Sequence, residues 1–258
     1  MKSKNIIPIL ILNLIATITL GQIGNQYQIA KINNWSEFEN LTYLEAKHHR
    51  INEESNKRTD RRYKADSLYL PTVSKERKKF LYEEYELKKR LNYKENRARY
   101  FIEYIEEDSI IVDKTFSMAD TISTECRCEI KNDSLQIKMG IWVFGGFFYN
   151  ISIKDKNFEL VYIEDAHEIE PFKYKRTDTS FVENLELKVK NSSLIFNKEF
   201  KLQIGEQLNG HLKFESPPYF VRSNYRGYSE EDKLEKGVTK GEIYFTCKLR
   251  EPFEPPEE

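Results

Sequence analysis

Apolar residues recur at helical spacing in the first part of the chain, up to about residue 107. Trp35, Phe38 and Leu41 begin one stripe. A second stripe runs in steps of three, four and seven residues through Phe80, Leu87, Leu91, Ala98, Phe101 and Ile105. Such steps place side chains on one face of an α-helix. Pro71 lies between the two stripes and disfavours one continuous helix. The pattern therefore predicts two helices, over residues 36–66 and 74–106, folded as a hairpin.

Beyond residue 108 the hydrophobic period changes to two. Apolar and polar residues alternate through segments that begin at Leu135, Leu185, Phe200 and Leu208. This alternation is typical of strands with one buried face, and it places His211 on the polar face of the last of them. Several such segments without an intervening helical pattern predict an antiparallel β-sandwich or a partly closed barrel.

One apolar run within this region, IWVFGGFFYNISI over residues 141–153, has the composition of a membrane segment. It is too short for a helix that spans a bilayer, which needs about 20 residues. Its two central residues, Gly145 and Gly146, both tolerate the positive φ of a tight hairpin turn. We therefore expect a β-hairpin in the core.

The N-terminus has the pattern of a secretory signal peptide. Lys2 and Lys4 precede an apolar run over residues 6–20, and small residues lead to a cleavage position after Gly21. The run is short for a membrane anchor and contains Pro8 and Asn13. We therefore expect an exported protein, periplasmic or extracellular, with no transmembrane segment after removal of the signal.

Together these patterns predict an α+β protein, with an N-terminal helical hairpin followed by an antiparallel β-sandwich or partly closed barrel. The expected organisation is a signal peptide at residues 1–21, a helical hairpin region at 22–107, a sandwich domain at 108–251 and a Pro/Glu-rich tail at 252–258. With 39% hydrophobic and 13% aromatic residues, the chain has the composition of a folded protein rather than a disordered one. Its formal net charge of −1 gives no reason to expect a nucleic-acid partner.

The three cysteines carry the sharpest chemical signal. In ECRCEI, Cys126 and Cys128 alternate with charged residues and so share one face of a strand; Cys247 also lies on the apolar face of its strand. All three thiols are therefore expected in the core. In an exported protein Cys247 can form a disulfide with either of the other two. Three reduced core thiols and a metal site are the alternatives, although C-x-C lacks the usual C-x-x-C zinc spacing.

One segment gathers carboxylates around an imidazole. Glu164, Asp165 and His167 lie in YIEDAHEIEP, which follows a predicted strand. Oxygen ligands at this density suggest a divalent-metal or acid/base site, and hence a metal-dependent hydrolase as an alternative function. A solvated loop explains the same residues. No nucleophile elbow, P-loop, H-E-x-x-H or dinucleotide fingerprint is present in the sequence, and we expect no cofactor.

Two surfaces are candidates for binding. The predicted hairpin would bring basic residues together at its tip, among them Arg61, Arg62, Lys78 and Lys79. The segment PPYFVRSNYRGY, over residues 217–228, is rich in tyrosine and arginine, which are favoured in recognition surfaces. Its candidate contact residues are Tyr225, Arg226 and Tyr228. The basic residues could instead belong to an ordinary solvated turn. The aromatic residues of 217–228 could instead fix that loop to the core.

These observations lead to one expected function. The chain is predicted to be an exported, non-catalytic binding or interaction protein of the cell envelope. Its partner would be a protein or an anionic glycan or other envelope component. An immunity or inhibitor protein that blocks a toxin has the same sequence features. The alternative enzyme function is a hydrolase with its metal at Glu164, Asp165 and His167.

Overall fold

The computed structural model describes residues 25–39, 95–106, 109–114, 126–142, 146–225 and 233–252. These residues form one short helix and thirteen strands. The elements are β1 (Gln28–Ile29), α2 (Trp35–Glu39), β2 (Arg97–Glu106), β3 (Ser109–Lys114), β4 (Cys126–Lys131), β5 (Ser134–Trp142), β6 (Gly146–Lys154), β7 (Asn157–Asp165), β8 (Phe172–Lys173), β9 (Asn184–Val189), β10 (Asn191–Phe196), β11 (Gln207–Glu215), β12 (Tyr219–Arg222) and β13 (Leu234–Arg250).

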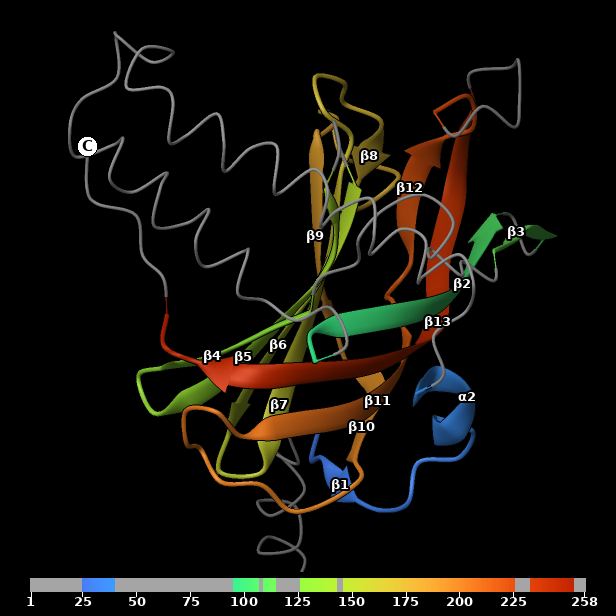
Figure 1. Ribbon diagram of the computed structural model, residues 1–258. Coiled ribbons are helices and arrows are strands. Elements are labelled where there is room, and N and C mark those ends of the chain that lie inside the picture. The colour runs from blue at the N-terminus through green and yellow to red at the C-terminus, as the bar shows by residue number, and fades with distance from the viewer. Residues whose placement is uncertain are drawn as a thin grey trace, which may run out of the picture.

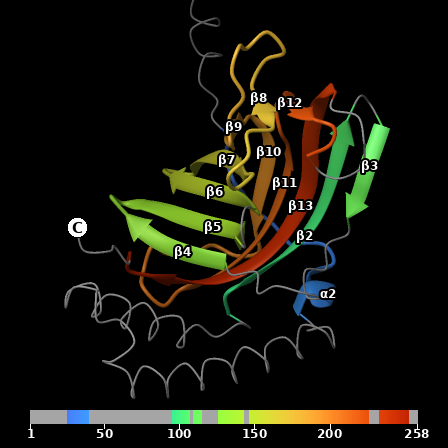
Figure 2. The same cartoon turned by 90° about the horizontal axis from the view of Figure 1, so that it is seen from above.

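The strands form one continuous mixed sheet that curls on itself (Figures 1 and 2). Its main path runs β1-β10-β11-β13-β4-β5-β6-β7-β9, and β2, β12, β8 and β3 branch from β13 and its neighbours. Strand β13 is 17 residues long and belongs to both arms of the curl, because it pairs with β11 and β2 over most of its length and with β4 at its end. Two pairings, β1 with β10 and β13 with β4, are parallel.

Two tight turns set the register of the arm that contains β4 to β7. Asn132 and Asp133 join β4 to β5, and both have positive φ; Asp155 and Lys156 join β6 to β7 in the same way. Two successive residues with positive φ match the right-handed twist of a hairpin. Between these turns β5 pairs with β6 from Leu135 to Trp142, which confirms the hairpin expected for the apolar run. The turn predicted at Gly145 and Gly146 is wrong, because Gly146 is the first residue of β6 and pairs with Trp142.

The core fills the inside of the curl. Along β6 the side chains alternate strictly between buried and half-buried positions, so that one face points inward. Inward side chains from the two arms meet there: the ring of Tyr149 on β6 lies 5.4 Å from Tyr162 on β7 and 4.9 Å from Phe214 on β11. These three side chains belong to one core cluster that includes residues from both arms.

The N-terminal segment forms hydrogen bonds with both arms at one end of the curled sheet. It then crosses to the outer face of the sheet. The backbone of Asn25 accepts a hydrogen bond from Phe158, and its side chain donates to Lys190 and Ser192. Helix α2 follows and packs on the outside of the sheet, where Phe38 meets Tyr244 of β13 (Figure 2).

The α+β prediction is wrong for the described residues. Their only helix is α2, and the residues predicted to end a second helix form β2, which pairs with β13 over ten positions. Ala98, Phe101 and Ile105 fit a helical stripe only because β2 has apolar residues on both faces. Its inward face carries Tyr100 and Ile102, which are buried in the core. The rest of the predicted hairpin, residues 40–94, lies outside the described residues, as do the signal peptide and the end of the tail.

Two smaller predictions also need correction. Residues 200–204 form an irregular loop instead of a strand, and Leu202 and Ile204 are exposed. The sheet is mixed rather than antiparallel, because β1 and β4 join it by parallel pairings. Within the described part of the chain, no helix is long and apolar enough to cross a membrane.

Candidate functional site

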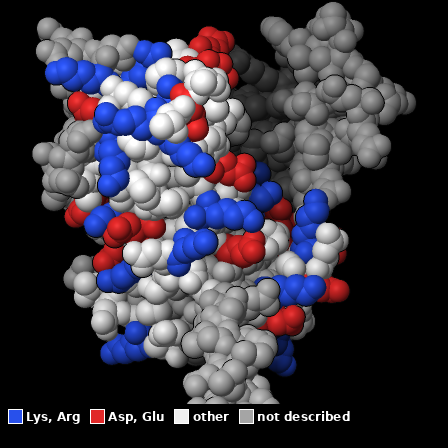
Figure 3. Space-filling view, turned by 180° about the vertical axis from the view of Figure 1, so that it is seen from behind, with Lys and Arg blue, Asp and Glu red and all other residues white. Residues whose placement is uncertain are grey.

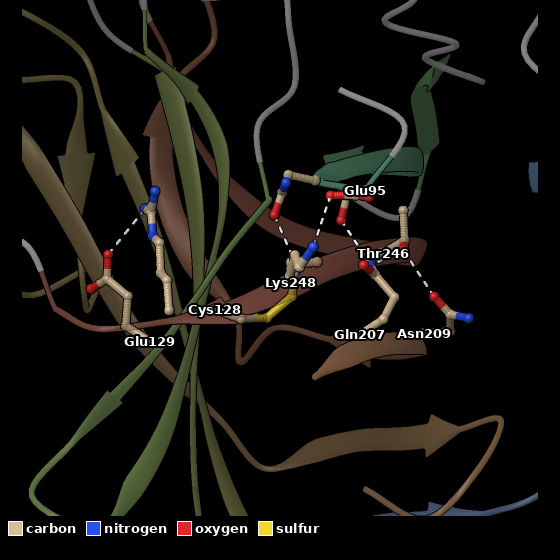
Figure 4. The surroundings of a disulfide bond; sticks show 10 residues. Glu95, Cys128, Glu129, Gln207, Asn209, Thr246 and Lys248 are labelled. Carbon is tan, nitrogen blue, oxygen red and sulfur yellow. Dashed lines mark hydrogen bonds and ion pairs between the residues drawn. A yellow bond between two sulfur atoms is a disulfide. The ribbon is translucent and has the colours of Figure 1, made fainter. Parts of the chain in front are cut away.

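The cysteines lie in the core, as their alternation predicts, and two of them are bonded. Cys128 on β4 and Cys247 on β13 form a disulfide with Cα atoms 5.9 Å apart (Figure 4). Cys126 is buried and takes no part in the disulfide. The expected disulfide through Cys247 is therefore confirmed, with Cys128 as the partner. Ion pairs from Lys248 to Glu95 and from Arg250 to Glu129 lie on either side of the bond.

The position of Asn96 accounts for the pairing of Cys247 with Cys128 instead of Cys126. In the parallel register Leu249 is opposite Cys128, so a continued ladder would place Cys247 opposite Cys126. Asn96 interrupts this ladder, because its backbone carbonyl accepts from the amide of Cys126 and its side chain accepts from the amide of Lys248. The three sulfur atoms nevertheless lie within 4.8 Å of one another.

The predicted His167 cluster is dispersed by a turn. His167 and Glu168 both have positive φ, and the amide of His167 donates to the carboxylate of Asp165. Glu164 points into the core and accepts a hydrogen bond from Tyr162 at 2.6 Å, whereas His167 is exposed. Among the residues that the structure describes, the cysteines are the only group of three or more His, Cys, Asp and Glu side chains with ligand atoms this close together.

The aromatic segment 217–228 contributes to the core more than to the surface. Tyr219 and Val221 on β12 are fully buried, and the hydroxyl of Tyr219 lies 3.0 Å from that of Thr239. Tyr225 is half-buried, with its ring 5.1 Å from that of Phe172. The other candidates of this segment, Arg226 and Tyr228, lie outside the described residues.

The predicted basic residues Arg61, Arg62, Lys78 and Lys79 also lie outside the described residues. On the face opposite to Figure 1, positive and negative side chains are interspersed among the described residues (Figure 3). Mixed charge of this kind gives this face no strong field to attract a polyanion.

The outer face of the sheet carries a groove of about 700 Å³ that the sequence did not reveal. Its floor consists of β10, β11, β13 and β2, which lie side by side in that order. Asn34 and Phe38, just before and within α2, form one wall. A volume of this size falls in the range of small-molecule sites, about 300–1,000 Å³.

Strand register places the floor residues in rows across the four strands. One row runs Ser193, Lys213, Glu242, Phe101, and the next runs Asn191, Glu215, Lys240, Glu103. Side chains directly opposite on neighbouring strands interact. Lys213 and Glu242 lie 2.6 Å apart in the first row, and Lys240 and Glu215 lie 3.0 Å apart in the second. Four ionic side chains of the floor are therefore held in ion pairs between β11 and β13.

The wall formed by α2 is anchored by a buried arginine of β2. Arg97 donates hydrogen bonds to the backbone carbonyls of Phe38 and Glu39, and its guanidinium lies 4.6 Å from the centre of the Phe38 ring. The last carbonyls of a helix have no partner within the helix, so this side chain satisfies them. Trp35 donates to Glu39 at 2.7 Å across the same turn. The wall is thus held against the floor by side-chain bonds.

Glu242 is the most heavily bonded acid of the groove. Its two oxygens accept from Lys213 and from His211, whose Nε2 lies 3.0 Å away. Burial alone would raise the pKa of Glu242, but the hydrogen bond and charge of Lys213, and then those of His211, lower it below its usual value. The imidazole of His211 stacks on Tyr244 at 4.2 Å, and burial lowers its pKa despite the nearby carboxylate.

Neither Glu242 nor His211 is well suited to move a proton for a ligand in the groove. A general base works best when its pKa lies near the working pH. The pKa of Glu242 is shifted away from neutrality, and both of its oxygens are already bonded. His211 is buried beside Tyr244 and does not line the groove.

The His211–Glu242 pair predicts a loss of stability in mild acid. The pKa of each group is lower in the folded protein than its ordinary value, so the unfolded chain binds more protons. The free energy of unfolding should therefore fall as pH drops below about 6.5, through His211, and again below about 4.5, through Glu242. Urea unfolding between pH 8 and pH 3 measures this dependence.

His211→Gln is the control for this pH dependence, because glutamine still donates a hydrogen bond to Glu242 but does not titrate. The variant should lose the first decrease and keep the second. If the wild-type protein and the variant show the same slope from pH 7.5 to 5.5, His211 does not titrate in the way the structure indicates.

Sequence reasoning missed the groove because its residues are the polar positions of amphipathic strands. Glu242 and Tyr244 alternate with the apolar positions of the strand that carries Cys247, so they lie on its outward face. Neither they nor Lys213 have a motif that separates a binding position from an ordinary solvated one. The feature of the sequence that came closest to indicating the groove is Phe101, an aromatic residue on the outward face of β2 between charged residues.

Comparison of the chain with protein-family models, with curated proteins and with solved structures finds no match.

Proposed function

We propose that this chain is an exported, non-catalytic binding protein whose ligand lies in the outer-face groove. The observation that carries the proposal is the groove floor itself, where two ion pairs between β11 and β13 hold four charged side chains in place. Side chains that are fixed before binding lose little conformational entropy when a ligand arrives. The wall formed by α2, anchored by Arg97, adds to this preorganisation.

Export is supported by two independent features. The N-terminal sequence has the charge and hydrophobicity of a signal peptide. The Cys128–Cys247 bond is of a kind that persists in oxidising compartments and is rare in the cytosol. A binding protein of the cell envelope is consistent with both.

Capture of a ligand from envelope extract of the native source tests this function. The immobilised protein is compared with a groove variant, Glu103→Gln/Lys240→Gln, and the retained proteins and glycans are identified by mass spectrometry. We expect at least one component to be retained by the wild-type protein and reduced about tenfold with the groove variant, since both substitutions remove charged hydrogen-bonding groups.

The matched control is Glu186→Gln/Lys188→Gln, which removes the same two residue types from exposed positions on β9. This control should retain the component like the wild-type protein. Equal retention by all three proteins, or retention of nothing by the wild-type protein, contradicts a binding role for the groove.

A further inference from the structure

We infer that the ligand of the groove is an uncharged oligosaccharide. The inference rests on the proposed function and specifies the chemistry of the ligand. It draws on three features of the groove: its charge balance, the bonding of its ionic groups, and an aromatic ring in its floor.

The ionic groups that line the groove are balanced. Three cations, Arg99, Lys213 and Lys240, face three carboxylates, Glu103, Glu215 and Glu242. Charges of opposite sign alternate across the floor, since Lys240 lies between Glu215 and Glu103 in the register. A site without net charge gives no long-range attraction to a polyanion or a polycation.

The pairing of these groups also disfavours a charged ligand. Glu242 is bonded to Lys213, and Glu215 to Lys240, so a charged group would have to compete with an existing partner. A hydroxyl group of a ligand does not have to displace either partner of an ion pair. An ammonium has three donors and a carboxylate about four acceptor positions, so each member of a pair can bond a hydroxyl while the pair stays intact. Sugar hydroxyls both donate and accept, which matches a floor of alternating donors and acceptors.

An aromatic ring lies among these groups. Phe101 is next to Glu242 in its row, and Arg99 and Glu103 lie two positions away on the same face of β2. Its ring meets Tyr244 edge to face at 5.9 Å and lines the groove. The face of an aromatic ring is negative, and it attracts the positive C–H edges of a saccharide ring as well as offering apolar contact. Hydrogen-bonding groups around one such ring match a pyranose, which has C–H faces and hydroxyl edges.

Calorimetric titration of the mature full chain tests the ligand class. The probes are four neutral oligosaccharides (maltotetraose, cellotetraose, mannotetraose and N-acetylated chitotetraose) and two charged ones (tetragalacturonate and a glucosamine tetramer). We expect at least one neutral probe to bind, with an affinity that changes less than about twofold between 20 mM and 300 mM NaCl, because no net charge is involved.

Two substitutions place this binding in the groove. Phe101→Ala should weaken it about tenfold by removing the stacking ring, and Glu103→Gln should weaken it several-fold while leaving the fold intact. Phe220→Ala, which removes a half-buried ring on β12 away from the groove, should leave the affinity unchanged.

Three outcomes overturn the inference. Binding of only the charged probes, with a steep dependence on salt, assigns the groove to an ionic ligand. Binding of a neutral probe that survives both Phe101→Ala and Glu103→Gln places the sugar site elsewhere. No binding of any neutral probe at millimolar concentration removes the saccharide, but groove-dependent capture from envelope extract would still support the proposed binding function. Loss of that capture as well would remove both proposals.

Discussion

Replacing Cys247 with alanine is expected to lower the free energy of unfolding by about 4–5 kcal/mol. The disulfide closes a loop with a sequence separation of 119 residues, and the chain-entropy description assigns about 4.7 kcal/mol to a loop of about 100 residues. The bond also joins β13 to β4, which share only two register positions, Leu249–Cys128 and Arg250–Glu129. Urea unfolding of the oxidised proteins at neutral pH measures the loss.

Cys126, the cysteine outside the disulfide, supplies the control for this prediction. Cys126→Ala removes one buried sulfur from the same cluster but leaves the disulfide intact, so the expected loss is about 1 kcal/mol. Urea unfolding of the wild-type protein in the presence of a reductant should give about the same free energy of unfolding as Cys247→Ala. If Cys247→Ala and Cys126→Ala lower the stability equally, the bond does not contribute as the structure indicates.

The second large effect is expected at Gly210, where β11 approaches an aromatic side chain of β13. Gly210 lies opposite Phe245 in the register, and a Cβ atom added at Gly210 would overlap the Phe245 ring. Phe245 is fully buried, so its ring has no free space to move into. Gly210→Ala should therefore lower the free energy of unfolding by about 2–3 kcal/mol, measured by urea unfolding.

A double-mutant cycle with Phe245→Leu distinguishes this overlap from a general effect of removing glycine. The smaller leucine makes room for the added methyl group, so the double variant should be more stable than the sum of the two single losses predicts. Gly205→Ala is the matched control, because Gly205 has a φ of +93° and open space around its Cβ position. Its loss, about 1 kcal/mol from backbone strain, should not change with Phe245→Leu. Strict additivity at Gly210 contradicts the proposed overlap.

The alternation of apolar and polar residues predicted most strands beyond residue 125. Leu135, Ile137 and Met139 are buried where the period of two places them, and so are Leu185 and Leu187. This succeeds because side chains alternate between the faces of any strand, whichever strand lies beside it. The prediction failed at residues 200–204, where the alternation is present but none of the strands that the structure describes pairs with the segment.

At β2 the local pattern pointed to the wrong element. Apolar residues on both faces of this strand reproduce helical steps, and the distinction depends on what each face contacts. Tyr100 meets the core, whereas Phe101 meets Tyr244 on the outer face. Two separate apolar environments cannot be recognised from spacing alone. The period-two alternation of Ala98, Tyr100, Ile102 and Tyr104 was the available signal.

By itself the sequence determined the strand-rich composition of residues 126–250 and the inward orientation of all three cysteines, because both follow from a local period. Only the tertiary structure decided that Cys128 is the partner of Cys247, since Asn96 separates Cys126 from the ladder. It also decided that a groove exists. The pairing of β2 with β13 brings Phe101 beside Glu242, and such a contact depends on the register between strands far apart in the chain.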